Sequence, residues 1–161
     1  MTRVNGRTKG LTAERAVANY FKAHGWPDAR RSVATGWSNG TTESGDVGDI
    51  LGVPGFAVQV KNLKSSLTGK ALDDVYQEAL AQCCALAKLT GQDCSAVIVE
   101  KRAGTADVGR WWAHLSNRVY LRLLTGRWQF TSGHHLVRVQ LGDVIGDLRL
   151  WSAEVERDYT S

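Results

Sequence analysis

Three side chains of complementary chemistry lie close together in the first half of the sequence: Asp49, Gln59 and Lys61. Gln59 and Lys61 are two residues apart, so on a strand they share one face. A carboxylate oxygen is the hard ligand that Mg²⁺ prefers, and the backbone carbonyl of Val60 offers another oxygen. A cation held there can polarise a phosphate and activate water, while Lys61 orients that water and offsets negative charge. The pattern predicts phosphodiester hydrolysis with Asp49, Gln59 and Lys61 as catalytic residues.

The predicted site depends on how two strands, residues 48–53 and 56–61, are joined at Pro54-Gly55. A two-residue turn with regular pairing would place Asp49 opposite Val60 and turn the carboxylate away from Lys61. A three-residue loop or a bulge would instead pair Asp49 with Lys61. We therefore expect one of these irregular connections in the hairpin.

Glu14 supplies a second acidic side chain, in an expected helix. It falls between Leu11 and Val17 in an apolar stripe, where a carboxylate is costly to bury unless it is paired or bound to metal. Taken alone, the alternative is favoured, in which Glu14 lies at the edge of the stripe and suits the helix N-terminus. Glu43 and Asp46 precede Asp49 and would be solvated or supply another ligand; we favour solvation.

Hydrophobic periodicity and turn residues predict a mixed α/β domain, with a central sheet flanked by helices. Expected helices are residues 11–24, 71–90 and 116–124, the last capped by Ser116 and ended by Gly126. Expected strands are residues 30–35, 48–53, 56–61, 95–100, 110–115, 128–130 and 136–141, and residues 143–150 fit a helical turn or a strand. Residues 1–10 are expected to form a flexible basic arm, followed by a single domain over residues 11–161.

The net charge of +4 and the isoelectric point of about 9.1 are compatible with a polyanionic partner. Five basic residues flank the loops beside the expected site and are candidate DNA contacts: Lys64, Lys70, Lys101, Arg102 and Arg110. The loop at residues 104–109, next to Trp111 and Trp112, would meet bases or a partner strand, although we favour core or dimer roles for both tryptophans. Without an apolar leader or spanning segment, a cytoplasmic location is expected.

Two segments resemble the signature of the PD-(D/E)XK nuclease superfamily: residues 48–52 (Gly-Asp-Ile-Leu-Gly) and residues 56–62 (Phe-Ala-Val-Gln-Val-Lys-Asn). Residues 13–17 (Ala-Glu-Arg-Ala-Val), with Phe21 and Gly25-Trp26, resemble the first helix of its Holliday-junction-resolvase-like branch, of bacteriophage and archaeal type. Residues 77–91 and 96–102 are similar to small bacteriophage nucleases of that group. The resemblance covers about residues 11–125 and implies a restriction-endonuclease-like fold.

This resemblance implies a Mg²⁺- or Mn²⁺-dependent endonuclease, commonly a homodimer, that cuts branched DNA. Glu14 and Asp49 match metal ligands, Gln59 matches the (D/E) position, and Lys61 matches the lysine. Gly48 replaces the proline, and Gln59 replaces the acid, which removes one negative charge from the metal site. Gln82 matches a polar residue near the family's site or is an exposed helix residue, and we favour exposure.

Two other functions remain open. One is a restriction-like or RecB-like nuclease that acts on linear or nicked DNA. The other is a DNA-binding protein without catalytic activity, because Gln59 departs from the acidic residue of the signature.

Overall fold

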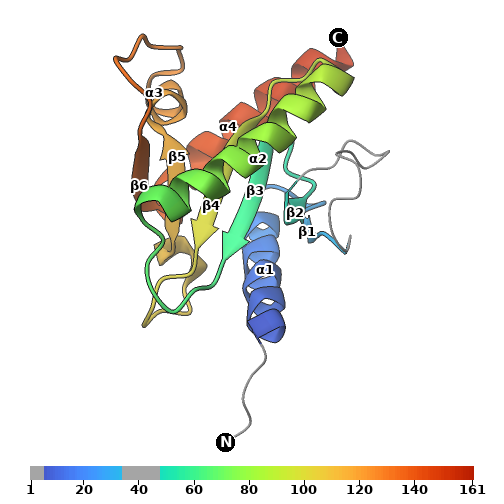
Figure 1. The fold of residues 1–161 in the computed structure, drawn as a ribbon. Helices are drawn as coiled ribbons and strands as arrows, with labels where there is room; N and C mark the ends of the chain where they lie inside the picture. The colour runs from blue at the N-terminus through green and yellow to red at the C-terminus, as the bar shows by residue number, and fades with distance from the viewer. Residues whose placement is uncertain (1–5, 34–47) are drawn as a thin grey trace, which may run out of the picture.

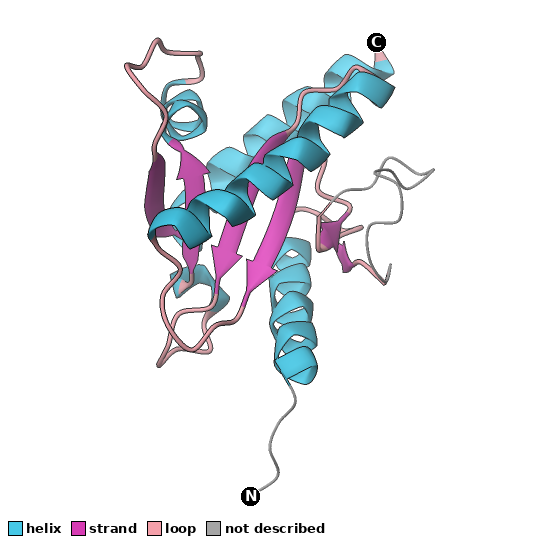
Figure 2. Ribbon diagram, viewed as in Figure 1, coloured by secondary structure: helices cyan, strands magenta, loops and turns pink. Residues whose placement is uncertain are grey.

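A computed structural model describes residues 6–33 and 48–161, and it has a six-stranded sheet covered by helices (Figures 1 and 2). The strands, in both chain and sheet order, are β1 (Arg30–Arg31), β2 (Ile50–Leu51), β3 (Phe56–Lys61), β4 (Ser95–Glu100), β5 (Trp112–Ser116) and β6 (Leu136–Gln140). The helices are α1 (Gly6–Ala23), α2 (Gly69–Thr90), α3 (Asn117–Thr125) and α4 (Leu141–Thr160), with a short 3₁₀ helix η1 (Val108–Arg110). The fold is therefore α/β with a mixed sheet, as the sequence predicts at this level.

The two faces of the sheet belong to different helices. Helix α2 crosses in front of the sheet in Figure 1, and its Tyr76, Ala79 and Cys83 pack on Ala57 of β3 and on β4. Helices α1 and α4 lie against the other face, in a larger core that includes Val58. Alternation along β3 thus sends Phe56, Val58 and Val60 one way and Ala57, Gln59 and Lys61 the other, as expected.

Among the strands of residues 6–33 and 48–161, only β3 and β4 run parallel, and the other neighbouring pairs are antiparallel. A parallel pair requires a crossover, and α2 provides it. The ends of β3 and β4 therefore meet at one edge of the sheet, where β5 begins. We call this the lower edge: residues 61–69 and 100–112, at the bottom of Figure 1.

Local signals explain most helix boundaries. Ser116 Oγ accepts a hydrogen bond from Val119 N at 3.1 Å, and Gly126 ends α3 at a φ of 71°, as predicted. Gly91 ends α2 in the same way, with its N–H donating to Ala87 O. Among the described helices, none is long and apolar enough to cross a membrane.

Several expected boundaries are wrong. Of the strands expected at residues 30–35 and 48–53, the described residues contain only the short β1 and β2. Helix α1 begins at Gly6, so residues 6–10 are helical rather than part of an arm. Residues 128–130 form no strand, and residues 110–115 divide between η1 and β5. For residues 143–150, where a helical turn or a strand was expected, the structure has a helix. They belong to the 20-residue α4, whose buried Val144, Ile145 and Leu148 follow a helical spacing that the sequence already contained.

The β2–β3 hairpin is irregular, as predicted, but the predicted pairing of Asp49 with Lys61 is wrong. Phe56 N donates to Val53 O, and Gly55 has a φ of 86°, which fits a Pro-Gly type II turn. One extra residue on the β2 side, at Gly52 with a φ of 75°, then shifts the register so that Ile50 pairs with Val58. Asp49 consequently lies beside the Gln59 position rather than opposite Lys61.

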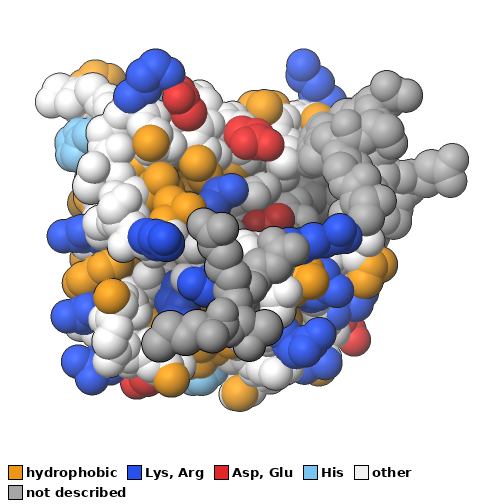
Figure 3. Space-filling view, turned by 60° about the horizontal axis from the view of Figure 1, so that its bottom comes forward, with side chains coloured by type: hydrophobic (Ala, Val, Ile, Leu, Met, Phe, Trp, Pro, Cys, Tyr) orange, Lys and Arg blue, Asp and Glu red, His pale blue; other side chains and the backbone are white. Residues whose placement is uncertain are grey.

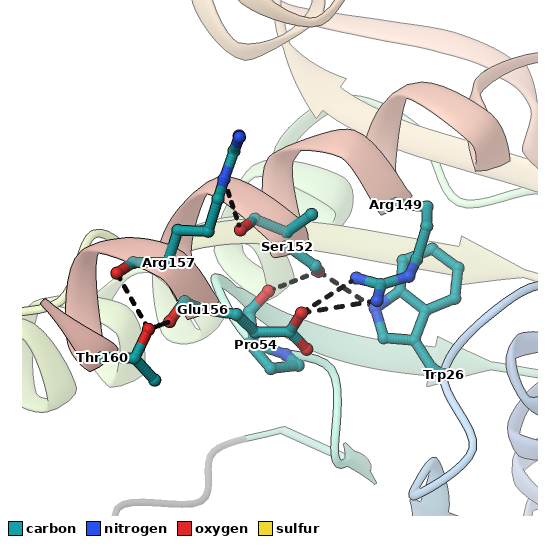
Figure 4. A network of polar contacts seen from close by, with 8 residues as sticks. Trp26, Pro54, Arg149, Ser152, Glu156, Arg157 and Thr160 are labelled. Carbon is teal, nitrogen blue, oxygen red and sulfur yellow. Dashed lines mark hydrogen bonds and ion pairs between the residues drawn. The ribbon is translucent and has the colours of Figure 1, made fainter.

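The hairpin turn is fastened to α4 by a buried hydrogen-bond chain (Figure 4). Trp26 Nε1 donates to Ser152 Oγ at 3.0 Å, and the same hydroxyl donates to Pro54 O. Beside this chain, Arg149 pairs with Glu156 and stacks over Trp26. The turn that precedes β3 is thereby held against the helical layer.

Candidate active site

The lower edge gathers the ends of several elements. Helix α1 reaches it at its N-terminal half, because Asn62 Nδ2, just after β3, donates to Lys9 O at 3.1 Å. Lys101 N donates to Lys61 O at 2.8 Å, which ties the ends of β3 and β4 together. Residues from α1, β3 and β4 that are far apart in the sequence are therefore neighbours here.

The Asp49 side chain hydrogen-bonds to the backbone of β3 where strand β2 does not. Strand β2 begins at Ile50, so the residue before it no longer pairs as a strand with β3. Instead, the Asp49 side chain supplies the partner, because its Oδ2 accepts a hydrogen bond from Val60 N at 2.8 Å. The N–H and C=O of a strand residue point the same way, so the Val60 carbonyl also faces this side of β3. Asp49 and the Val60 carbonyl thus offer two oxygens at one place.

Glu14 lies close enough to Asp49 for their charges to interact. Burial raises the pKa of Glu14, and the Asp49 charge raises it further, whereas Arg31 and Lys61 lower it. Glu14 Oε2 is 3.6 Å from Arg31 Nη1, and its side chain is 21% exposed. Glu14 therefore lies at the margin of the apolar stripe and has a cationic partner.

Burial also raises the pKa of Asp49, while the Val60 N–H and the Lys61 charge lower it, and Glu78 of α2 raises it. The charge of Lys61 acts on both acids. The structure therefore brings together Glu14 of α1, Asp49 immediately before β2, and Lys61 at the end of β3. Two partly buried carboxylates whose pKa values are both raised by burial would be stabilised in their charged forms by a cation.

Gln59 belongs to the α2 face. Its Nε2 donates to Gln82 Oε1 at 3.1 Å, and the two side chains are only 8% and 4% exposed. Gln82 is thus a buried partner of Gln59, and the expectation that it is an exposed helix residue is wrong. Gln59 Oε1 has no hydrogen-bond partner among the described residues, which leaves it available as a neutral ligand.

The donors present suit a hard divalent cation. Mg²⁺ needs only one or two carboxylates from the protein, with water completing its shell. Glu14, Asp49 and the Val60 carbonyl are all oxygen donors, and Gln59 Oε1 could add a fourth. In residues 6–33 and 48–161, no three His, Cys, Asp or Glu side chains form a ready-made ligand cluster, so this donor set relies on backbone and amide oxygens.

Gly48 is required by the backbone beside Asp49. Its φ is 87°, and a Cβ added there would lie 2.7 Å from Val58 O and 2.8 Å from Val58 N. Proline has a φ near −65° and cannot adopt this conformation. The glycine that stands where the family signature has proline therefore fits the geometry of this hairpin.

The five candidate DNA contacts all lie on the lower edge or immediately beyond it. Lys64 follows β3, Lys101 and Arg102 follow β4, and Arg110 ends η1. Lys70, in the first turn of α2, pairs with Asp74 at 2.7 Å, so its charge is partly neutralised. Lysine and arginine side chains are prominent on the face that this edge presents in Figure 3, with fewer acidic ones.

Sequence reasoning missed a buried contact between a histidine and a carboxylate on the α2 face. His114 Nε2 lies 2.8 Å from Glu100 Oε2, and Glu100 Oε1 accepts from Leu67 N at 2.8 Å. Burial lowers the pKa of His114, although Glu100 opposes this shift. The sequence signal for this contact was Glu100, a charged residue directly after the apolar run at residues 96–99.

Comparison with protein-family models, with curated proteins and with solved structures finds no match for this chain. Glu43 and Asp46, the other acids considered as ligands, lie outside the described residues.

Proposed function

We propose that the chain is a divalent-metal-dependent endonuclease that hydrolyses phosphodiester bonds in DNA, with branched DNA such as a four-way junction as its substrate. The observation that carries this proposal is the hydrogen bond from Val60 N to Asp49 at the end of β3, where the charge of Lys61 acts on both Asp49 and Glu14. Two acids, a lysine and a carbonyl oxygen at one strand end suit metal-assisted phosphoryl chemistry. The cation would be Mg²⁺ or Mn²⁺.

Each residue has a separate task in this proposal. Glu14, Asp49 and the Val60 carbonyl would hold the cation, which supplies charge neutralisation and activation of water when bound. The Lys61 ammonium lies near both acids and would stabilise the negative charge that develops on the scissile phosphate. The Asp49–Val60 hydrogen bond fixes the carboxylate before substrate binds, which reduces the cost of ordering it.

Gln59 is the main departure from the signature, and its surroundings suggest how activity would survive. The Gln59–Gln82 hydrogen bond holds the amide in place without a charge. A neutral ligand leaves the site with two acids rather than three, so metal affinity should be weaker than with a glutamate. Gln59→Glu should therefore lower the Mg²⁺ concentration needed for half-maximal cleavage.

Cleavage of labelled four-way, flapped and linear DNA in Mg²⁺ tests the proposal. Wild type, Asp49→Ala and Lys61→Ala are compared, with Lys22→Ala as a control for loss of an exposed lysine on α1. We expect wild type and the control to cut, and both site variants to lose at least about 100-fold in rate, as expected when a principal charge-stabilising group is removed.

The pattern of products separates the other functions. Symmetric cuts in the four-way junction support the junction substrate, whereas preference for linear DNA or ends supports a restriction-like or RecB-like nuclease. DNA binding without cleavage in Mg²⁺ or Mn²⁺, unchanged by Lys61→Ala, would favour a non-catalytic DNA-binding protein and contradict the proposal.

A further inference from the structure

Two arginines converge on one tryptophan beside the candidate active site. The guanidinium carbon of Arg102 lies 4.5 Å from the ring centroid of Trp112, and that of Arg138 lies 4.7 Å from it. Trp112 is half-buried and Arg138 is exposed. Stacking on an indole keeps a guanidinium flat and leaves its N–H edge free for hydrogen bonds.

The register places this group level with Lys61. One row across the sheet runs from Lys61 to Glu100, then to Trp112 and Gln140. Neighbouring strands are about 4.8 Å apart, so Trp112 lies about 10 Å from Lys61 along this row. That distance corresponds to about three nucleotides of a stacked strand, at roughly 3.4 Å each.

No acid among the described residues neutralises the charges of the two arginines. Two other stacked arginines have acidic partners, since Arg122 pairs with Glu154 and Arg149 with Glu156. A third, Arg118, stacks alone on Trp128 without such a partner among the described residues. Within the described part of the chain, neither Arg102 nor Arg138 has such a pair. The acid in their row, Glu100, is buried, and its two oxygens are occupied by Leu67 N and His114.

We propose that Arg102, Trp112 and Arg138 form a clamp for the phosphodiester backbone of the nucleic-acid substrate, on the β5–β6 part of the sheet. The clamp rests on the proposed function, since it assigns a binding position to that substrate. The two guanidinium groups of the clamp contact phosphates. Trp112 holds the guanidinium groups in place and does not stack on a base. The clamp anchors the strand away from the cut, so it contributes to binding and not to the chemical step.

DNA affinity measured against salt concentration tests the clamp. A labelled duplex is titrated in EDTA at 50–200 mM salt with wild type and the Arg102→Gln/Arg138→Gln variant. Each lost phosphate contact lowers the slope of log affinity against log salt by about 0.9. When salt is raised fourfold, the affinity of wild type should therefore fall by a factor about ten times larger than the factor for the variant, which has lost two contacts.

Two matched variants separate charge from stacking and from folding. Arg122→Gln/Arg149→Gln removes two stacked arginines that already have acidic partners, and it should leave the salt slope unchanged. Arg102→Lys/Arg138→Lys keeps both charges without the planar fork, so it should keep the slope and weaken affinity. In cleavage assays, the Gln variant should raise KM and leave kcat unchanged.

The outcomes distinguish failure of the clamp from failure of the nuclease proposal. If wild type cuts DNA and the Arg102→Gln/Arg138→Gln variant keeps the wild-type salt slope, the clamp is refuted and the nuclease stands. If wild type binds without cutting and the variant loses slope, the clamp stands and the nuclease falls. If the Arg102→Gln/Arg138→Gln variant differs from wild type in sedimentation coefficient but not in the salt dependence of DNA binding, the surface serves self-association and the clamp is refuted.

Discussion

Gly48 gives the most direct test of how the hairpin holds Asp49. Replacing it by alanine adds one methyl group at a φ of 87°, next to the backbone of Val58. The nearest atoms, Val58 O and N, would lie 2.7 and 2.8 Å from the new carbon. Both distances are too short for contact without movement, and both atoms belong to a fully buried residue of β3.

The expected cost combines two effects. A non-glycine residue held at positive φ costs about 1–3 kcal/mol, and relief of the contact requires backbone movement in a close-packed core. We expect Gly48→Ala to lower the free energy of unfolding by about 2–3 kcal/mol. For a domain of this size, that corresponds to a fall in Tm of about 4–12 °C.

Gly146→Ala is the matched control. Gly146 lies inside α4 without a positive φ, and an added Cβ would meet nothing within 4 Å. Alanine is favoured over glycine in a helix by about 0.5–1 kcal/mol, so this variant should be more stable than wild type. The same chemical change should therefore act in opposite directions at the two positions.

Urea and thermal unfolding followed by circular dichroism measure both variants, and DNA cleavage measures the consequence for Asp49. A displacement of about 1 Å at a catalytic group can cost about 100-fold, so Gly48→Ala should also lose cleavage. Equal or greater stability of Gly48→Ala, relative to wild type, would refute the backbone argument. Lost stability with full cleavage would refute the link between Gly48 and the placement of Asp49.

Three further predictions use other parts of the structure. Mg²⁺ at tenfold its Kd should stabilise wild type by about 1.4 kcal/mol, a Tm rise of about 3–6 °C in scanning fluorimetry, and Asp49→Asn should abolish this rise. Burial lowers the pKa of His114, so as the pH falls the histidine of the unfolded chain is protonated before that of the folded chain. The free energy of unfolding should therefore keep the His114 contribution above about pH 6.5 and lose it progressively below that pH. In urea unfolding, His114→Gln should make this decline less steep. Ser152→Ala leaves Trp26 Nε1 without its acceptor in a buried setting and should cost about 1–3 kcal/mol in the same assay.

Each of these has a control at an exposed position: Asp158→Asn for the metal response, His134→Gln for the pH response and Ser161→Ala for the hydroxyl. An Mg²⁺-dependent Tm rise that persists in Asp49→Asn would place the cation elsewhere. An unchanged pH profile in His114→Gln would assign the acid sensitivity to other groups. Full stability of Ser152→Ala would mean that another acceptor replaces the hydroxyl.

The candidate site was only partly predictable from sequence. Strand alternation predicted the shared face of Gln59 and Lys61, and the hairpin is irregular as predicted, although Asp49 does not pair with Lys61. The position of the extra residue at Gly52 was not predicted, because the sequence does not specify which of the two strands carries the bulge. Gln82 was misjudged since its burial follows from the way α2 crosses β3, which helix periodicity alone does not specify.

What the sequence by itself determined about this protein is mostly local: the alternation of β3, the buried apolar run of β4, the Pro54–Gly55 turn, the Ser116 cap and the glycine ends of α2 and α3. These features depend on hydrogen bonds and backbone preferences within about four residues. The tertiary structure alone decided which side chains meet across the chain, as Glu14 does with Asp49 and Glu100 with Leu67 and His114. Such contacts form because packing a sheet between helical layers fixes distances between segments whose local preferences carry no information about one another.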